Sequence, residues 1–118
     1  MSPTLTPDAI ALLRDTAAKA CTLLKVMANE DRLLLLCQLT QGERNVGDLE
    51  SLCGIRQPTL SQQLGVLREE GLVSARREGK YIYYSLASAE AIAVMNTLYG
   101  LFCGNPAQVG ASADAIET

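Results

Sequence analysis

The chain has 118 residues, 48% of them hydrophobic, which suits one folded domain and leaves little room for a second core. Its formal net charge of −3 argues mildly against nucleic-acid binding, which usually leaves a basic footprint. It contains four cysteines without C-x-x-C spacing and no histidine, so the commonest general base and the usual zinc-ligand patterns are missing.

Residues 1–6 are predicted to form a flexible N-terminus without the basic and apolar regions of a signal peptide. No apolar run approaches the ~20 residues of a membrane helix, so we expect a cytoplasmic protein that does not associate with membranes. Apolar residues then recur at helical spacing from residue 7 to about 28, which predicts a first helix with Thr6 as its N-cap.

The second and third helices are each introduced by an asparagine. Asn29 is expected to cap a helix that continues through residue 39, with acidic residues in its first turn. Asn45 is expected to cap a short third helix that ends at Gly54.

A fourth helix, predicted over residues 56–69, carries one apolar stripe formed by Leu60, Leu64 and Leu67. Gly71 ends it, and residues 72–77 and 81–86 follow as two strands, joined by a glycine-containing turn at residues 78–80.

A last helix is predicted over about residues 87–103, followed by a flexible tail at 104–118. The order of four helices, a hairpin and a helix predicts a mainly α fold with a β-hairpin wing. The sequence therefore indicates a winged helix-turn-helix domain over residues 7–103.

The fourth helix and the hairpin carry residue types that contact DNA. With the leucines inward, Gln62 lies on the opposite face; glutamine pairs bidentately with adenine, while arginine and lysine bind phosphates. Residues 56–86 hold five basic and three acidic residues, a local charge of +2. A polar helix face alone is more often simply exposed to solvent than used to bind DNA. The basic hairpin that follows makes DNA binding the favoured interpretation. The candidate DNA contacts are Arg56, Gln57, Thr59, Ser61, Gln62, Gln63, Arg68, Arg76, Arg77 and Lys80.

Residues 56–86 resemble the recognition helix and wing of the ArsR family of bacterial repressors, above all in the run QPTLSQQLGVLREEGLV at residues 57–73. Residues 28–33, ANEDRL, resemble the segment that opens the family's second helix, and the likeness covers about residues 15–103. It implies a homodimer built on the first and last helices. Such a dimer would bind double-stranded, pseudo-palindromic operator DNA and release it when a sensory site is occupied or oxidised.

The resemblance also implies which inducer the sensory site detects. Residues 45–50 lack the third-helix cysteines of the family's metal sensors, and the chain lacks the histidine of its zinc sensors. A sulfide-responsive branch, the BigR and SqrR regulators, has one cysteine in the second helix and one at the end of the last. Cys37 and Cys103 match these positions, which implies reactive sulfur species (persulfide or polysulfide) as inducer and a disulfide or polysulfide bridge as the switch.

Several roles for the four cysteines are compatible with the sequence. Buried free cysteine is common and inert, so spacing alone favours packing roles. Cys21 lies on the apolar face of the first helix and is expected in the core, and Cys53 is ambiguous. The family resemblance favours Cys37 and Cys103 as a sensory pair. The other candidates are a sensor of a thiophilic ion such as As(III) or Cu(I), a general peroxide-responsive repressor, and a DNA-binding protein without a sensor. No enzyme, metal site or cofactor is expected.

Overall fold

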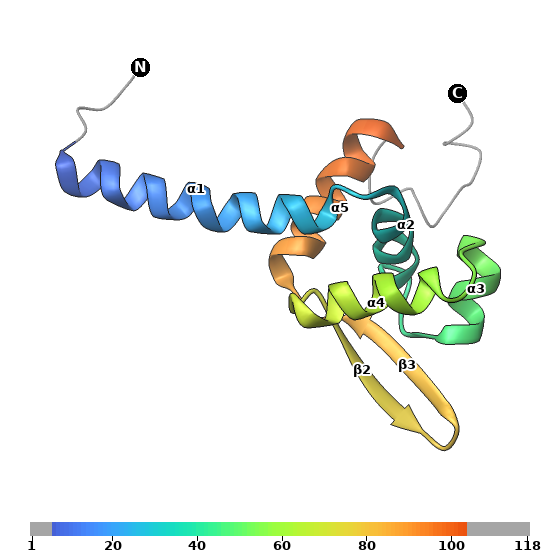
Figure 1. Cartoon of the computed structure of the whole chain (residues 1–118). Helices are drawn as coiled ribbons and strands as arrows, with labels where there is room; N and C mark the ends of the chain where they lie inside the picture. Colours follow the sequence, from blue (N-terminus) through green and yellow to red (C-terminus); the bar gives the residue numbers. More distant parts are fainter. Residues whose placement is uncertain (1–5, 104–118) are drawn as a thin grey trace.

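The computed structural model describes residues 6–103, so the segments 1–5 and 104–118, predicted to be flexible, lie outside the described residues. Within residues 6–103, five helices and three strands follow in the order α1 (Pro7–Met27), α2 (Glu30–Leu39), β1 (Arg44–Asn45), α3 (Val46–Cys53), α4 (Thr59–Glu69), β2 (Val73–Glu78), β3 (Tyr81–Leu86) and α5 (Ala89–Phe102) (Figure 1). The predicted winged helix-turn-helix order is confirmed.

Polar side chains fix where four of the helices begin. Each accepts a hydrogen bond from the backbone N–H three residues further on: Thr6 (3.1 Å), Asn29 (3.0 Å), Asn45 (2.8 Å) and Ser88 (3.0 Å). Such a cap contributes about 1 kcal/mol to helix stability. The caps at Thr6, Asn29 and Asn45 were predicted, as was the end of α3 at Gly54, whose φ of 70° suits glycine.

Three leucines of α4 lie in the centre of the core. Leu60, Leu64 and Leu67 are 0%, 1% and 0% exposed, so the predicted inward stripe is confirmed. They belong to one cluster with buried residues of α2, α3, β2 and α5, which include Leu35, Leu36, Leu49, Val73, Ala91 and Met95. Because this cluster holds one face of α4, the opposite face of the helix is free to meet another molecule.

The helix α4 begins three residues later than predicted, at Thr59 instead of Arg56. Proline disfavours helical backbone at the residue before it, so Gln57 cannot continue a helix into Pro58. Arg56 and Gln57 therefore lie in the turn between α3 and α4.

The wing is a three-stranded antiparallel sheet in the order β1-β3-β2. Glu78 pairs with Tyr81, so Glu78 belongs to β2 and the predicted three-residue turn is shorter by one residue. Gly79, at a φ of 64°, lets the chain reverse within this turn. Strand β1 was not predicted; Arg44 pairs with Tyr84, which ties the segment between α2 and α3 to the wing.

Helix α1 extends away from the rest of the molecule (Figure 1), and only Val26 and Met27 near its C-terminal end are buried. The prediction that Cys21 packs in the core is wrong for the single chain, where Cys21 is exposed. Helical periodicity identifies an apolar face without saying what covers it. None of the helices in residues 6–103 has the length and apolarity needed to cross a membrane.

Candidate functional site

The outward face of α4 consists of exposed polar side chains. Gln62 is exposed on the side of α4 opposite the buried leucines, with Ser61 exposed beside it and Arg68 exposed in the last turn. Thr59, in the first turn, is half-buried. This arrangement matches a recognition helix, whose first turns meet base edges in the major groove.

Gln57, a predicted DNA contact, also forms hydrogen bonds with the first turn of α4. Its side-chain Oε1 accepts hydrogen bonds from the Ser61 backbone N–H (3.1 Å) and from Ser61 Oγ (2.7 Å). Gln57 therefore supplies the side-chain acceptor at the start of α4 that Pro58 cannot offer. Its amide nitrogen and the exposed Arg56 guanidinium stay candidate DNA contacts.

Gln63 anchors α4 to its neighbours. Its Oε1 accepts a hydrogen bond from Arg32 Nη1 at 2.8 Å, and Arg32 Nε donates to the Val26 carbonyl at 2.6 Å. Arg32 thus joins α2, the end of α1 and α4. Sequence reasoning missed Arg32, because nothing in its local pattern indicates a partner 31 positions away. That Gln63 contacts DNA stays a prediction, and the side-chain amide nitrogen of Gln63 would make this contact.

The basic residues of the wing differ in their surroundings. Arg77 and Lys80 are exposed, whereas Arg76 is held by two carboxylates. Arg76 donates from Nε and Nη2 to Glu43 (both 2.8 Å) and from Nη1 to Glu78 (2.7 Å). The hydrogen bond from Arg76 lowers the pKa of Glu43, so this carboxylate stays charged and opposes an approaching phosphate.

Replacing Glu43 by glutamine is expected to strengthen DNA binding. The change replaces one of the two carboxylate oxygens that accept from Arg76 by an NH₂ group and removes a negative charge beside the guanidinium, so operator affinity at low salt should rise about two- to fivefold. Fluorescence anisotropy of labelled operator measures this. Glu90→Gln on α5 makes the same charge change as a control and should raise affinity less. Unchanged or weaker binding by Glu43→Gln would contradict this role of Glu43.

Cys37 and Cys103 line one cavity of about 290 Å³ between α2 and α5. Its other lining residues are almost all apolar: Glu30, Leu33, Leu34, Met95, Leu98, Tyr99 and Phe102. Both thiols are free in this structure. The fold therefore places two cysteines that are 66 positions apart in the sequence on the lining of one cavity, and their pairing stays a prediction.

Hydroxyl groups surround Cys37 on one side of this cavity. Tyr99 Oη lies 2.6 Å from Cys37 Sγ, 3.2 Å from Thr40 Oγ1 and 3.3 Å from the Cys37 carbonyl oxygen. Thr40 Oγ1 donates to the same carbonyl at 2.6 Å. Burial raises the pKa of Tyr99, and its hydrogen bond with Cys37 acts in the same direction.

The other two cysteines do not line this cavity. Cys53 Sγ donates to the Leu34 carbonyl at 3.7 Å, and burial raises the pKa of this thiol, with Cys37 acting in the same direction. Cys21 is exposed on α1 and does not line the cavity. Within residues 6–103, no three side chains of histidine, cysteine, aspartate or glutamate lie close enough together to hold a metal ion.

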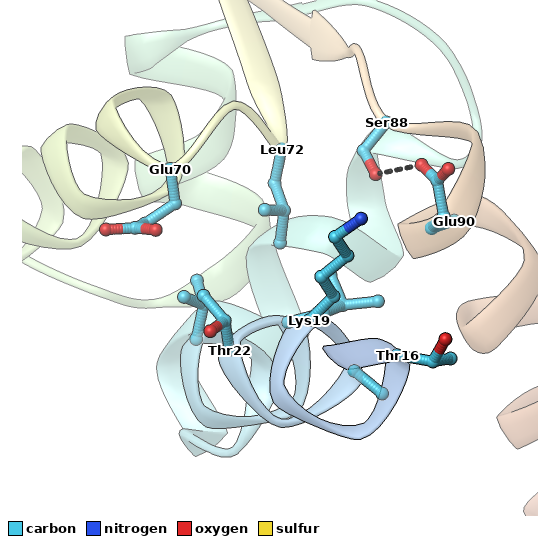
Figure 2. Close-up of a pocket in the computed structure, with 10 residues that line it drawn as sticks. Thr16, Lys19, Thr22, Glu70, Leu72, Ser88 and Glu90 are labelled. Atoms are coloured by element: carbon cyan, nitrogen blue, oxygen red, sulfur yellow. Dashed lines mark hydrogen bonds between the residues drawn. The ribbon is translucent and has the colours of Figure 1, made fainter. Parts of the chain in front are cut away.

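A larger cavity, of about 480 Å³, lies between α1, the end of α4 and the start of α5 (Figure 2). Lys19 and Glu90 extend from opposite sides, and Ser88 Oγ donates to Glu90 at 3.4 Å. This cavity contains neither Cys37 nor Cys103. The candidate sensory site is therefore the smaller cavity.

The helices α3 and α4, joined by a short turn and followed at once by a wing, define the chain as a winged helix-turn-helix DNA-binding protein. Residues 29–75 match the family described as "Bacterial regulatory protein, arsR family". The chain is 54% identical over 87 residues to the "Biofilm growth-associated repressor" of Agrobacterium fabrum, covering 74% of each chain. The chain therefore belongs to the arsR family of bacterial regulators.

Two further relatives are similar over most of their length. The "Transcriptional activator HlyU" of Vibrio cholerae is 44% identical over 91 residues, which are 77% of this chain and 84% of that protein. The crystal structure of the transcriptional repressor BigR from Xylella fastidiosa superposes with a TM-score of 0.74 at 49% identity, covering 77% of this chain and 93% of that one. All three relatives are transcriptional regulators, which confirms the prediction of a regulator instead of an enzyme.

Proposed function

We propose that the protein is a homodimeric transcriptional repressor that releases operator DNA when reactive sulfur species oxidise Cys37 and Cys103. Repression is supported by three relatives named "Biofilm growth-associated repressor", which are 50–54% identical to this chain. The sensory part is carried by one observation: both thiols line a single, nearly apolar cavity between α2 and α5. One structural relative is described as reduced HlyU, which is consistent with a redox-dependent regulator.

Unpartnered apolar side chains on α1 and α5 support a dimer built on these helices. The exposed ones on α1 are Ile10, Leu12, Leu13 and Leu24, and those on α5 are Ile92, Leu101 and Phe102. Large apolar residues gathered on two helices mark a protein interface. In such a dimer α5 would form part of both the interface and the wall of the thiol cavity. A bridge from α2 to α5 would then change the spacing of the two α4 helices, which must fit half-sites about 34–36 Å apart.

The chemistry balances with a hydropersulfide RSSH as oxidant. The Cys37 thiolate attacks the terminal sulfur, which forms a Cys37 persulfide and releases RS⁻. The Cys103 thiolate then attacks Cys37 Sγ, which forms a disulfide and releases HS⁻. Two thiols lose two electrons in total, and the donor is reduced to a thiol and hydrogen sulfide. A donor that leaves additional sulfur atoms in the bridge gives a polysulfide. Because this bridge is longer than a disulfide, the two cysteines need not come as close together.

Operator release after polysulfide treatment tests this function. Operator DNA selected in vitro with reduced protein is labelled, and its binding is followed by fluorescence anisotropy. We expect polysulfide to weaken binding by the wild type at least tenfold, in the range of typical coupling energies. Cys37→Ser and Cys103→Ser should bind operator and lose the response, because each lacks one end of the bridge.

The matched controls are Cys21→Ser and Cys53→Ser, which should keep the response. Release that persists in both Cys37→Ser and Cys103→Ser would refute the sensory assignment. Parallel treatments with arsenite, Cu(I) and peroxide separate the alternatives. Release by arsenite or Cu(I) alone would identify a thiophilic-metal sensor, and equal release by peroxide and polysulfide would identify a general redox sensor.

A further inference from the structure

The hydroxyl cluster in the thiol cavity distinguishes the two cysteines. We infer that the Tyr99 hydroxyl activates Cys37 as the first thiol to attack the sulfur donor, which leaves Cys103 to close the bridge; this inference rests on the proposed function. Tyr99 Oη lies 2.6 Å from Cys37 Sγ. Within residues 6–103, no hydrogen-bond partner reaches Cys103 Sγ.

A donor is needed because the helices themselves do not favour a thiolate here. Cys37 lies in the last turn of α2, and Cys103 follows the last residue of α5. The carbonyl groups at the C-terminal end of a helix carry partial negative charge, which opposes a second negative charge nearby. The two thiols are alike in this respect, so the Tyr99 hydroxyl is what sets Cys37 apart.

The proton of Tyr99 can turn from the Cys37 carbonyl to the sulfur. Tyr99 Oη donates to this carbonyl over a long 3.3 Å, whereas Thr40 Oγ1 donates to it at 2.6 Å. The carbonyl therefore keeps its closer donor when the Tyr99 proton turns to the sulfur. While Cys37 is a thiol, either group can donate in this hydrogen bond; when the thiol proton leaves to water, only the Tyr99 O–H can donate to the sulfur. Burial raises the pKa of Tyr99, so the phenol keeps its proton throughout.

The inference is tested with an alkylating agent instead of the sulfur donor, so its outcome does not depend on operator release. Cys103→Ser is treated with iodoacetamide from pH 6 to 10, with and without Tyr99→Phe, and modification of Cys37 is followed by mass spectrometry of its peptide. We expect Tyr99→Phe to slow Cys37 alkylation about tenfold at pH 7, the typical loss for a hydrogen bond to a charged group. The rate at high pH should be unchanged.

The shape of the pH profile separates activation from packing. The titratable groups around Cys37 are Tyr99 on α5, Cys103 directly after α5, Cys53 on α3 and Glu30 on α2. Proteins with and without Tyr99→Phe share all of these groups except Tyr99. A shift of the pH profile of Cys37 alkylation to higher pH therefore reports the loss of the Tyr99 hydroxyl. Tyr99→Phe keeps the aromatic ring. If Tyr99 acted only by packing of its ring, the pH profile of Cys37 alkylation would not change.

Two controls complete the test. Tyr81→Phe removes a hydroxyl from the wing, where Tyr81 is half exposed, and should leave Cys37 alkylation unchanged. In Cys37→Ser, Tyr99→Phe should change Cys103 alkylation less than twofold. An unchanged Cys37 profile, or equal slowing of both cysteines, would overturn the role of Tyr99. Failure of the proposed function is a separate result, in which the wild type keeps its operator after polysulfide.

Discussion

Leu64→Ala is expected to lower the free energy of unfolding by about 3 kcal/mol, because it removes a fully buried side chain from the centre of the core. Leu64 is 1% exposed and belongs to the cluster that joins α4 to α2, α3 and the wing. The surrounding helices cannot close the cavity completely, so the loss exceeds the transfer free energy of the side chain. Urea unfolding at one fixed protein concentration measures it, since a dimer's stability depends on concentration.

Leu52→Ala is the matched control. Leu52 lies on α3, within the same helix-turn-helix, and is 51% exposed, so its truncation should cost less than about 1 kcal/mol. Equal losses for the two variants would mean that the leucine stripe of α4 is not the face that holds this helix in the core.

Gln62→Ala is expected to weaken binding to the selected operator about 5- to 150-fold, the equivalent of about 1–3 kcal/mol for one bidentate base contact. The side chain is uncharged and exposed opposite the buried leucines, so its loss should leave binding to unrelated DNA unchanged. Titrations of operator and of scrambled duplex at the same salt concentration measure both affinities.

Gln41→Ala removes another exposed glutamine, beyond the end of α2, and should change neither affinity. A Gln62 variant that binds operator as tightly as the wild type would remove the base-reading role of this face. A variant that loses both affinities equally would place Gln62 in general DNA binding instead of sequence recognition.

The parts of the fold that were predicted from sequence depend on neighbouring residues. A cap such as Asn29 acts on an N–H three positions away, and the stripe at Leu60, Leu64 and Leu67 repeats with the helical period. Both the cap and the apolar stripe are formed by residues of a single helix and its flanking residues, so the local sequence is enough to predict them. The predicted start of α4 was wrong because proline is tolerated in the first turn of a helix, whereas here its steric effect on Gln57 keeps that residue outside the helix.

The features missed from sequence join distant segments. Tyr99 lies 62 positions from Cys37, and Glu43 lies 33 positions from Arg76. Strand β1, with two residues, is too short to show a periodicity. Cys21 shows a different limit, because an apolar helix face looks the same whether its own chain or a partner covers it. The proposed pairing of Cys37 with Cys103 was predicted only from the family resemblance.

The proposed function requires that Cys37 and Cys103 of one chain become joined as operator is lost. It is tested most directly by intact-mass and peptide mapping of one sample whose operator binding is recorded during polysulfide titration. We expect a peptide pair linked through Cys37 and Cys103, by two or more sulfur atoms, whose yield rises in parallel with operator release. Complete release while both thiols are still open to alkylation would contradict it.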